Sequence, residues 1–359
     1  MISKYKILFL KILYIFFTFL SLTIFFFSTT KVEAKAFDID NIEITEPFEI
    51  NFNKNKIIDK GFKKAFLELT SLIVSSLDQK KINQTKLNDI KGMVESFSIK
   101  EEKFINEIYY VNLGVSFNKK KVFSYLEKKN IFPSIPSKKK ILFIPIIIDE
   151  SKKDLLIFSD NKFYKEWNNY VKSFHLIEYV LPTEDLEDFR LIKDKFEFIE
   201  EYDFKEITNK YSLQDSIVSL IFKNNKEVRI LSKISINNNI ILKNQSYLNL
   251  DINNSEEIKS TINNLKDIFE DYWKNYNQIN TSIKLDLNIK ISNEKKLEIL
   301  NFEKILNETD LIYDFFISKF DKNFIYYQVT FNGTPNNFLN YMSKNNYNFD
   351  TQNKIWILK

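Results

Sequence analysis

The feature that most constrains the fold is an apolar run at residues 141–148, which contains five isoleucines. The run is far shorter than the roughly 20 residues that a membrane-spanning helix needs. It shows no alternation of apolar and polar residues, which is typical of a strand buried on both faces of a sheet. The sequence therefore predicts an α/β layer built around this run.

The region 138–280 continues the α/β pattern. Turn residues, many of them asparagine, separate short segments with strand character from segments with helical periodicity. The other expected strands are 176–181, 215–222, 227–234 and 240–248. The expected helices are one through Phe163, Trp167 and Val171, one at 204–210 and one at 255–276. We predict a middle domain with a mixed α/β sheet.

Two further domains flank this one. Residues 37–137 read as βααββα, and Pro133, Pro136 and the lysines at 138–140 mark a linker after them. Residues 281–359 read as βαββαβ, the order of a ferredoxin-like unit, and about 80 residues suit one such unit. The fold class is therefore α+β or α/β, in three small modules. This class does not reveal function, because one fold hosts many activities.

Residues 1–36 are predicted to be a signal segment. Lys4 and Lys6 precede an apolar stretch at 12–27, and Ala34 and Ala36 form the A-x-A pattern that signal peptidase recognises. We expect cleavage after Ala36. The alternative is an uncleaved anchor in the inner membrane, because the segment is about long enough to span a bilayer. In both cases the rest of the chain lies in the periplasm.

Charge and cysteine content exclude several classes of protein. Residues 1–36 hold five lysines and one acid of the chain's 52 basic and 48 acidic residues, so 47 of each remain. A neutral body lacks the clustered cations of a nucleic-acid-binding protein. The chain has no cysteine, which rules out a disulfide scaffold and a lipid-modified cysteine.

Few residues suggest chemistry. His175 is the only histidine, so a zinc site, or a catalytic serine or cysteine paired with a histidine, would depend on it. A structural role is the favoured interpretation of this residue. Asp149 and Glu150 follow the buried strand, at the edge where α/β sheets bind ligands. A solvated turn is the favoured alternative for this pair. The glycines are too far apart for a phosphate loop, and we predict no metal or cofactor.

Aromatic residues form 16% of the chain. Most have the spacing of core residues, but Trp167 and Trp273 are candidates for anchors at a protein interface, where tryptophan is enriched. The alternative for both is core packing.

Several stretches resemble a known family. They are Gly61-Phe62, Ala65-Phe66 with Leu69, Phe97-Ser98-Ile99, residues 111–117, Ile131-Phe132-Pro133 and the closing Ile355-Trp356-Ile357-Leu358. Together they are similar to the exported proteobacterial proteins that share domain of unknown function two-thousand-and-sixty-six. The resemblance implies export and this order of modules, and it implies no reaction and no catalytic residues.

We therefore expect a non-enzymatic interaction or assembly protein of the cell envelope. Its expected partners are envelope proteins, and it would touch the membrane only through an uncleaved N-terminal segment. One alternative is a carboxylate-dependent hydrolase of an envelope polymer, which needs two acids about 5 to 10 Å apart. The other is a small-ligand-binding protein with its pocket over Asp149 and Glu150.

Overall fold

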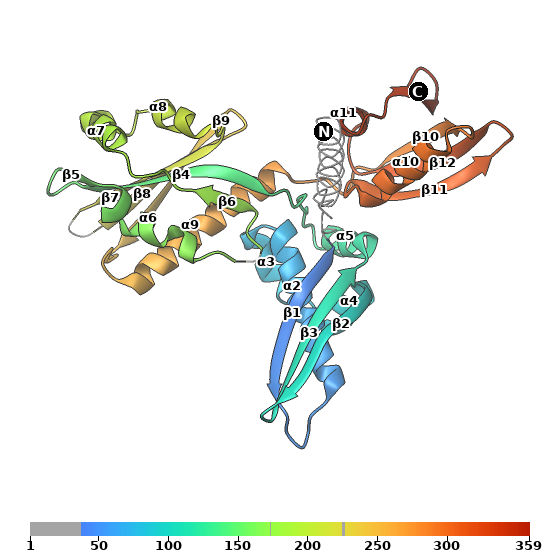
Figure 1. The fold of residues 1–359 in the computed structure, drawn as a ribbon, viewed down its shortest axis with the longest axis horizontal. Helices are drawn as coiled ribbons and strands as arrows, with labels where there is room; N and C mark the ends of the chain where they lie inside the picture. Colours follow the sequence, from blue (N-terminus) through green and yellow to red (C-terminus); the bar gives the residue numbers. More distant parts are fainter. Residues whose placement is uncertain (1–36, 173, 225–226) are drawn as a thin grey trace, which may run out of the picture. The chain divides into compact units, whose positions relative to one another are not determined.

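A computed structural model describes residues 37–359 apart from residues 173, 225 and 226. These residues form three separate sheets, one in each of the ranges 37–137, 138–280 and 281–359, together with helices (Figure 1). The predicted α+β class is confirmed. That each range folds as an independent domain stays a prediction. None of the described helices combines the length and the apolar character needed to cross a membrane.

The first module contains a three-stranded antiparallel sheet in the order β1-β3-β2. Its elements are β1 (Asp38–Pro47), α2 (Lys54–Ile73), α3 (Ser76–Ile82), α4 (Leu87–Met93), β2 (Val94–Ile105), β3 (Ile108–Phe117) and α5 (Lys119–Lys128). The β2–β3 turn is only Asn106 and Glu107, both with positive φ.

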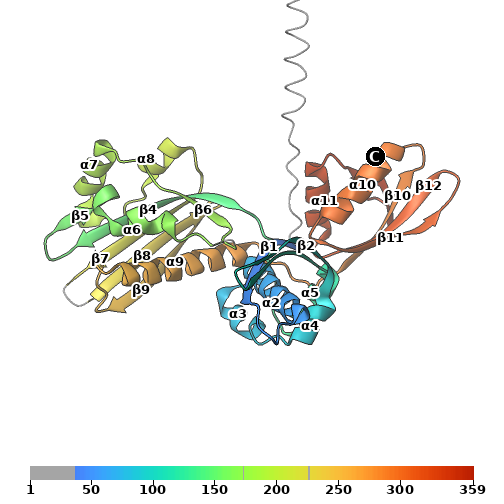
Figure 2. The same ribbon diagram turned by 60° about the horizontal axis from the view of Figure 1, so that its bottom comes forward.

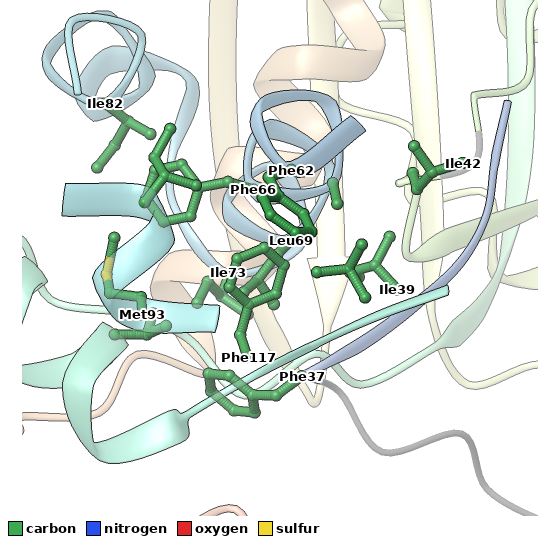
Figure 3. Packing of buried hydrophobic residues seen from close by; sticks show 14 of the residues in the cluster. Phe37, Ile39, Ile42, Phe62, Phe66, Leu69, Ile73, Ile82, Met93 and Phe117 are labelled. Atoms are coloured by element: carbon green, nitrogen blue, oxygen red, sulfur yellow. The ribbon is translucent and has the colours of Figure 1, made fainter. Parts of the chain in front are cut away.

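Helix α2 supplies much of the core of this module. The side chain of Asn53 caps its start by accepting hydrogen bonds from two backbone N–H groups. Phe62, Phe66, Leu69 and Ile73 then follow at helical spacing and are buried (Figure 3). Gly61 lets the helix lie close to the sheet, because a Cβ atom there would come within 2.3 Å of a methyl carbon of Leu113.

The middle module is a mixed sheet in the order β5-β4-β7-β8-β9, with β6 paired to β4. Its strands are β4 (Lys139–Asp149), β5 (Asp154–Leu156), β6 (Ile177–Val180), β7 (Ser216–Lys223), β8 (Glu227–Ile236) and β9 (Asn239–Leu248). Its helices are α6 (Lys162–Glu166), α7 (Leu186–Asp194), α8 (Lys205–Thr208) and α9 (Ser255–Tyr276). β4 runs parallel to both β6 and β7.

Strand β4 is buried on both faces, as its composition predicts. Ile141 and Phe143 pack into the core on the α9 side, and Leu142 and Ile144 pack into the core on the α7 and α8 side. Figure 2 shows α9 on one side of the sheet and α7 and α8 on the other. The module is therefore a three-layer structure around one central strand.

The third module contains the predicted βαββαβ order and one additional short strand. Its elements are β10 (Leu285–Ser292), α10 (Lys296–Glu308), β11 (Ile312–Phe320), β12 (Phe324–Phe331), α11 (Pro335–Lys344), β13 (Phe349–Asp350) and β14 (Ile355–Leu358). The sheet order is β11-β12-β10-β14-β13. Because β13 and β14 form a hairpin, the chain reverses once more and β14 runs parallel to β10.

Candidate functional site

The carboxylate of Asp149 lies at the C-terminal end of β4 and closes the turn toward β5. One of its oxygens accepts hydrogen bonds from the hydroxyl of Ser151 at 2.6 Å and from the backbone N–H of Lys152 at 3.1 Å. The Ser151 hydrogen bond is the main reason that the pKa of Asp149 lies below its usual value. Glu150 is exposed. This geometry favours the turn interpretation of the pair.

His175 lies at the other end of the same sheet. It precedes β6, whose first residue Ile177 pairs with Lys139 at the start of β4. Asp149 is the last residue of this 11-residue strand, so about 30 Å separates it from the start, at roughly 3.3 Å per residue. The structure therefore does not bring His175 together with the two acidic candidates.

His175 is buried, with 9% of the residue exposed. Its Nδ1 accepts a hydrogen bond from the backbone N–H of Lys172, and its Nε2 is buried without a hydrogen-bond partner in the described part of the chain. Burial lowers the pKa of His175 to about 4, and the nearby ammonium groups of Lys266, Lys172 and Lys274 act in the same direction. The ring is therefore neutral at neutral pH.

Helix α9 carries three buried charged residues at four-residue spacing, Lys266, Glu270 and Lys274, which we call the α9 polar stripe. Burial lowers the pKa of Lys266 to about 8 and also lowers that of Lys274. It raises the pKa of Glu270. Such pKa shifts of buried charged groups are often found at functional sites, but structural networks also produce them.

The hydrogen bonds of the α9 polar stripe indicate a structural role. Lys266 donates to the carbonyl oxygens of Trp167 at 2.7 Å and Tyr170 at 2.9 Å. Glu270 accepts from the backbone N–H groups of Leu176 and Ile177 at 2.9 to 3.0 Å. These contacts hold the irregular chain that precedes β6. No group of three or more metal-ligating side chains occurs among the described residues.

Trp167 and Trp273, the two candidate interface anchors, are core residues, as the alternative interpretation of both expects. Trp167 is fully buried, and its ring stacks on Phe143 with 3.8 Å between ring centroids. Trp273 is 4% exposed and donates its indole N–H to the carbonyl of Ser137. Neither indole is available to a partner. The predicted cleavage site at Ala34 and Ala36 lies outside the described residues.

A different set of apolar side chains is exposed, at the end of the first sheet where β1 finishes and β2 turns into β3. We call this set the apolar tip; it consists of Phe48, Ile50, Phe104, Ile105 and Ile108. Register places Ile105 opposite Ile108 and Ile108 opposite Pro47. The N–H of Phe48 donates to the carbonyl of Glu107 at 2.7 Å, which ties the loop after β1 to the turn.

Ring packing gives the apolar tip a defined shape. The ring centroid of Phe48 lies 4.5 Å from that of Phe104 and 4.6 Å from that of Phe52. Phe52 in turn packs edge-on against Tyr109 at 4.9 Å, which connects the tip to the core of the module. These rings are held in contact with one another although the outer ones face solvent.

Ion pairs flank the apolar tip. Glu102 contacts Lys54 at 2.8 Å and also accepts a hydrogen bond from the Tyr109 hydroxyl, and Glu46 contacts Lys60 at 2.6 Å. Burial is the main cause that raises the pKa of Tyr109 to about 12. The surface is therefore an apolar centre with a charged rim, the usual composition of a protein-binding surface.

Sequence reasoning missed the apolar tip although a signal was present. Phe48 and Ile50 lie in a turn between a strand and a helix, where polar residues are usual. Phe52 of the same loop packs against the core, but three apolar residues in one short loop are more than the core needs, which indicates a surface role for the others.

No family model matches this chain, and no curated protein matches it either. The resemblance to the exported family therefore stays a prediction.

Proposed function

We propose that this protein is a non-catalytic interaction module of the cell envelope that binds another protein through the apolar tip. The observation that carries the proposal is the exposure of the tip: Ile50 is fully exposed, and Phe104 and Ile105 are each more than half exposed. Exposed apolar side chains gathered at one end of a sheet typically mark an interaction site. Aromatic residues at its centre are typical of residues that dominate binding energy.

The packing of the tip supports tight binding. Phe48 and Phe104 are already in contact before any partner arrives, and the short β2–β3 turn fixes their backbone. A surface that is ordered in advance loses little conformational entropy when it binds. The tip therefore suits recognition of a folded or extended protein surface with apolar side chains.

An extracytoplasmic location is part of the proposal. It is supported by the lysine-led apolar segment at residues 1–36 and by the A-x-A pattern at Ala34 and Ala36. Cell fractionation would test the location independently of the binding function.

Site-specific photocrosslinking tests the binding function. A photoreactive residue at position 50 should capture one protein from intact cells, and the Phe104→Ser substitution should abolish this crosslink. The matched control is position 297 on α10 of the third module, where Leu297 is also highly exposed. Equal crosslinking from both positions, or none from position 50, would contradict the proposal.

A further inference from the structure

The outer edge of β9 differs from other sheet edges in this protein. β9 pairs with β8 over ten residues without a bulge, and no described strand pairs with its other side. It carries a single charged residue, Lys243, while Ile240, Leu242 and Leu248 are 59 to 78% exposed. A long, regular, apolar edge of this kind is a template for pairing with another strand.

Strand β2 provides a contrast within the same chain. It is also an edge strand, but its register shifts twice, between Val94 and Ser96 and between Ile99 and Glu101. Four consecutive charged residues, 100–103, follow its centre. Bulges and charges are the features that natural proteins use to block edge pairing. β2 is protected in this way and β9 is not.

The β8–β9 turn determines which backbone groups of β9 face outward. Ile236 pairs with Asn239 across a two-residue turn, Asn237 and Asn238, in which both residues have positive φ. In such a hairpin the closing pair exchanges hydrogen bonds, and every second residue after it does the same. The backbone groups that point away from β8 are therefore those of Ile240, Leu242, Asn244, Ser246 and Leu248.

These outward groups are complementary to themselves. If two copies of β9 run antiparallel with Asn244 opposite Asn244, all five outward residues pair and form about ten main-chain hydrogen bonds. Ile240 then lies opposite Leu248 of the second copy, so the most exposed apolar side chains of β9 cover each other. Lys243 lies opposite Gln245, and no like charges face one another.

Neighbouring registers fit less well. If the second copy slides so that Lys243 lies opposite Lys243, two equal charges face one another, which is destabilising. If it slides in the other direction, so that Gln245 lies opposite Gln245, Ile240 has no partner in the second β9. On the α9 side, the favoured register also pairs Ile241 with Tyr247, a combination of β-branched and aromatic residues that stabilises sheets. One register therefore satisfies backbone, apolar and charged groups together.

We infer that β9 is the interface for a second copy of this chain, which joins the two middle sheets into one continuous sheet about a two-fold axis at Asn244. This interface is isologous, because the same strand serves both copies. It is separate from the apolar tip, so it does not depend on the proposed function.

Substitutions of Asn244 test the proposed dimer. The monomer–dimer equilibrium is measured by analytical sedimentation of the protein purified from cells that express the full chain. Asn244→Asp and Asn244→Lys should each weaken the dimer by roughly 5-fold, because equal charges meet on the axis. An equal mixture of the two variants should restore a mixed dimer, since opposite charges then face each other. Lys243→Glu is the control and should leave dimerisation unchanged, because its neighbour is Gln245.

A second variant tests the backbone. Asn244→Pro removes an outward N–H without removing a bond to β8, so it should abolish the dimer while the far-ultraviolet circular dichroism remains that of the unsubstituted protein. A chain that stays monomeric at the highest attainable concentration would overturn the inference. So would a dimer that tolerates Asn244→Pro, or charge variants that do not recover when mixed.

Discussion

Acidification should destabilise this protein through His175. The folded-state pKa of this imidazole is about 4, against 6.5 for the free side chain, because the ring is buried beside lysine ammonium groups. Between these two pH values the unfolded chain binds a proton that the folded chain does not. Stability from this residue is therefore complete above pH 6.5 and is lost as the pH falls toward 4. The total loss is about 3 kcal/mol.

Neighbouring acids act in the opposite direction. Burial raises the pKa of Asp267 and Glu270, so each of these carboxyls binds its proton more readily in the folded state. Their stability contribution increases as the pH falls, which offsets part of the effect of His175. The contribution of the imidazole is isolated by subtracting the curve of a His175→Gln variant from that of the unsubstituted protein.

Two measurements check this prediction. Urea unfolding at intervals from pH 7 to pH 4 gives the free energy of unfolding of the unsubstituted protein and of the His175→Gln variant. The difference between these two free energies should change by about 3 kcal/mol as the pH falls, to the disadvantage of the unsubstituted protein. A proton NMR titration gives the pKa directly, because the chain has one histidine and hence one imidazole signal to follow. A measured pKa near 6.5, or parallel unfolding curves, would refute the reasoning.

Two further substitutions test packing and hydrogen bonding, each by urea unfolding. Glu270→Ala should lower the free energy of unfolding by about 2 to 5 kcal/mol, because two buried backbone N–H groups lose their acceptor. Glu256→Ala, a change at an exposed residue of the same helix, is the control and should cost little. Equal losses from the two variants would contradict the structural role of Glu270. Gly61→Ala should cost about 1 to 3 kcal/mol through its clash with Leu113. Gly92→Ala has open space and should instead stabilise helix α4 by up to about 1 kcal/mol, so a loss there would contradict the steric argument.

The elements with a strong apolar pattern, continuous or periodic, could be predicted from the sequence. The apolar run in β4 and the long amphipathic helix α9 lie where their patterns place them, within a residue or two. Helix α7 is absent from the elements expected from the sequence, because acidic residues after a proline are also typical of an exposed turn. In the structure, Asp185 caps this helix and two acids lie in its first turn, an arrangement that stabilises a helix start.

The site predictions were less successful, for physical reasons. Trp273 follows Phe269 and Leu265 at helical spacing, so its burial could have been derived from the pattern of α9 alone. The register that gathers the apolar tip could not be derived, because it depends on the pairing of β2 with β3 and on a loop contact from Phe48. Long-range pairing decides which exposed residues become neighbours.

The burial of Lys266 makes this residue a reporter of the separation of α9 from the sheet of the middle module. Its amine, like that of any lysine, can be acylated only when a reagent reaches it. In the folded protein both hydrogen bonds of the amine go to backbone carbonyls inside the middle module, and the side chain has no exposed surface. Covalent labelling of this lysine, followed by mass spectrometry, would therefore time how often α9 separates from the sheet, while surface lysines are modified at once.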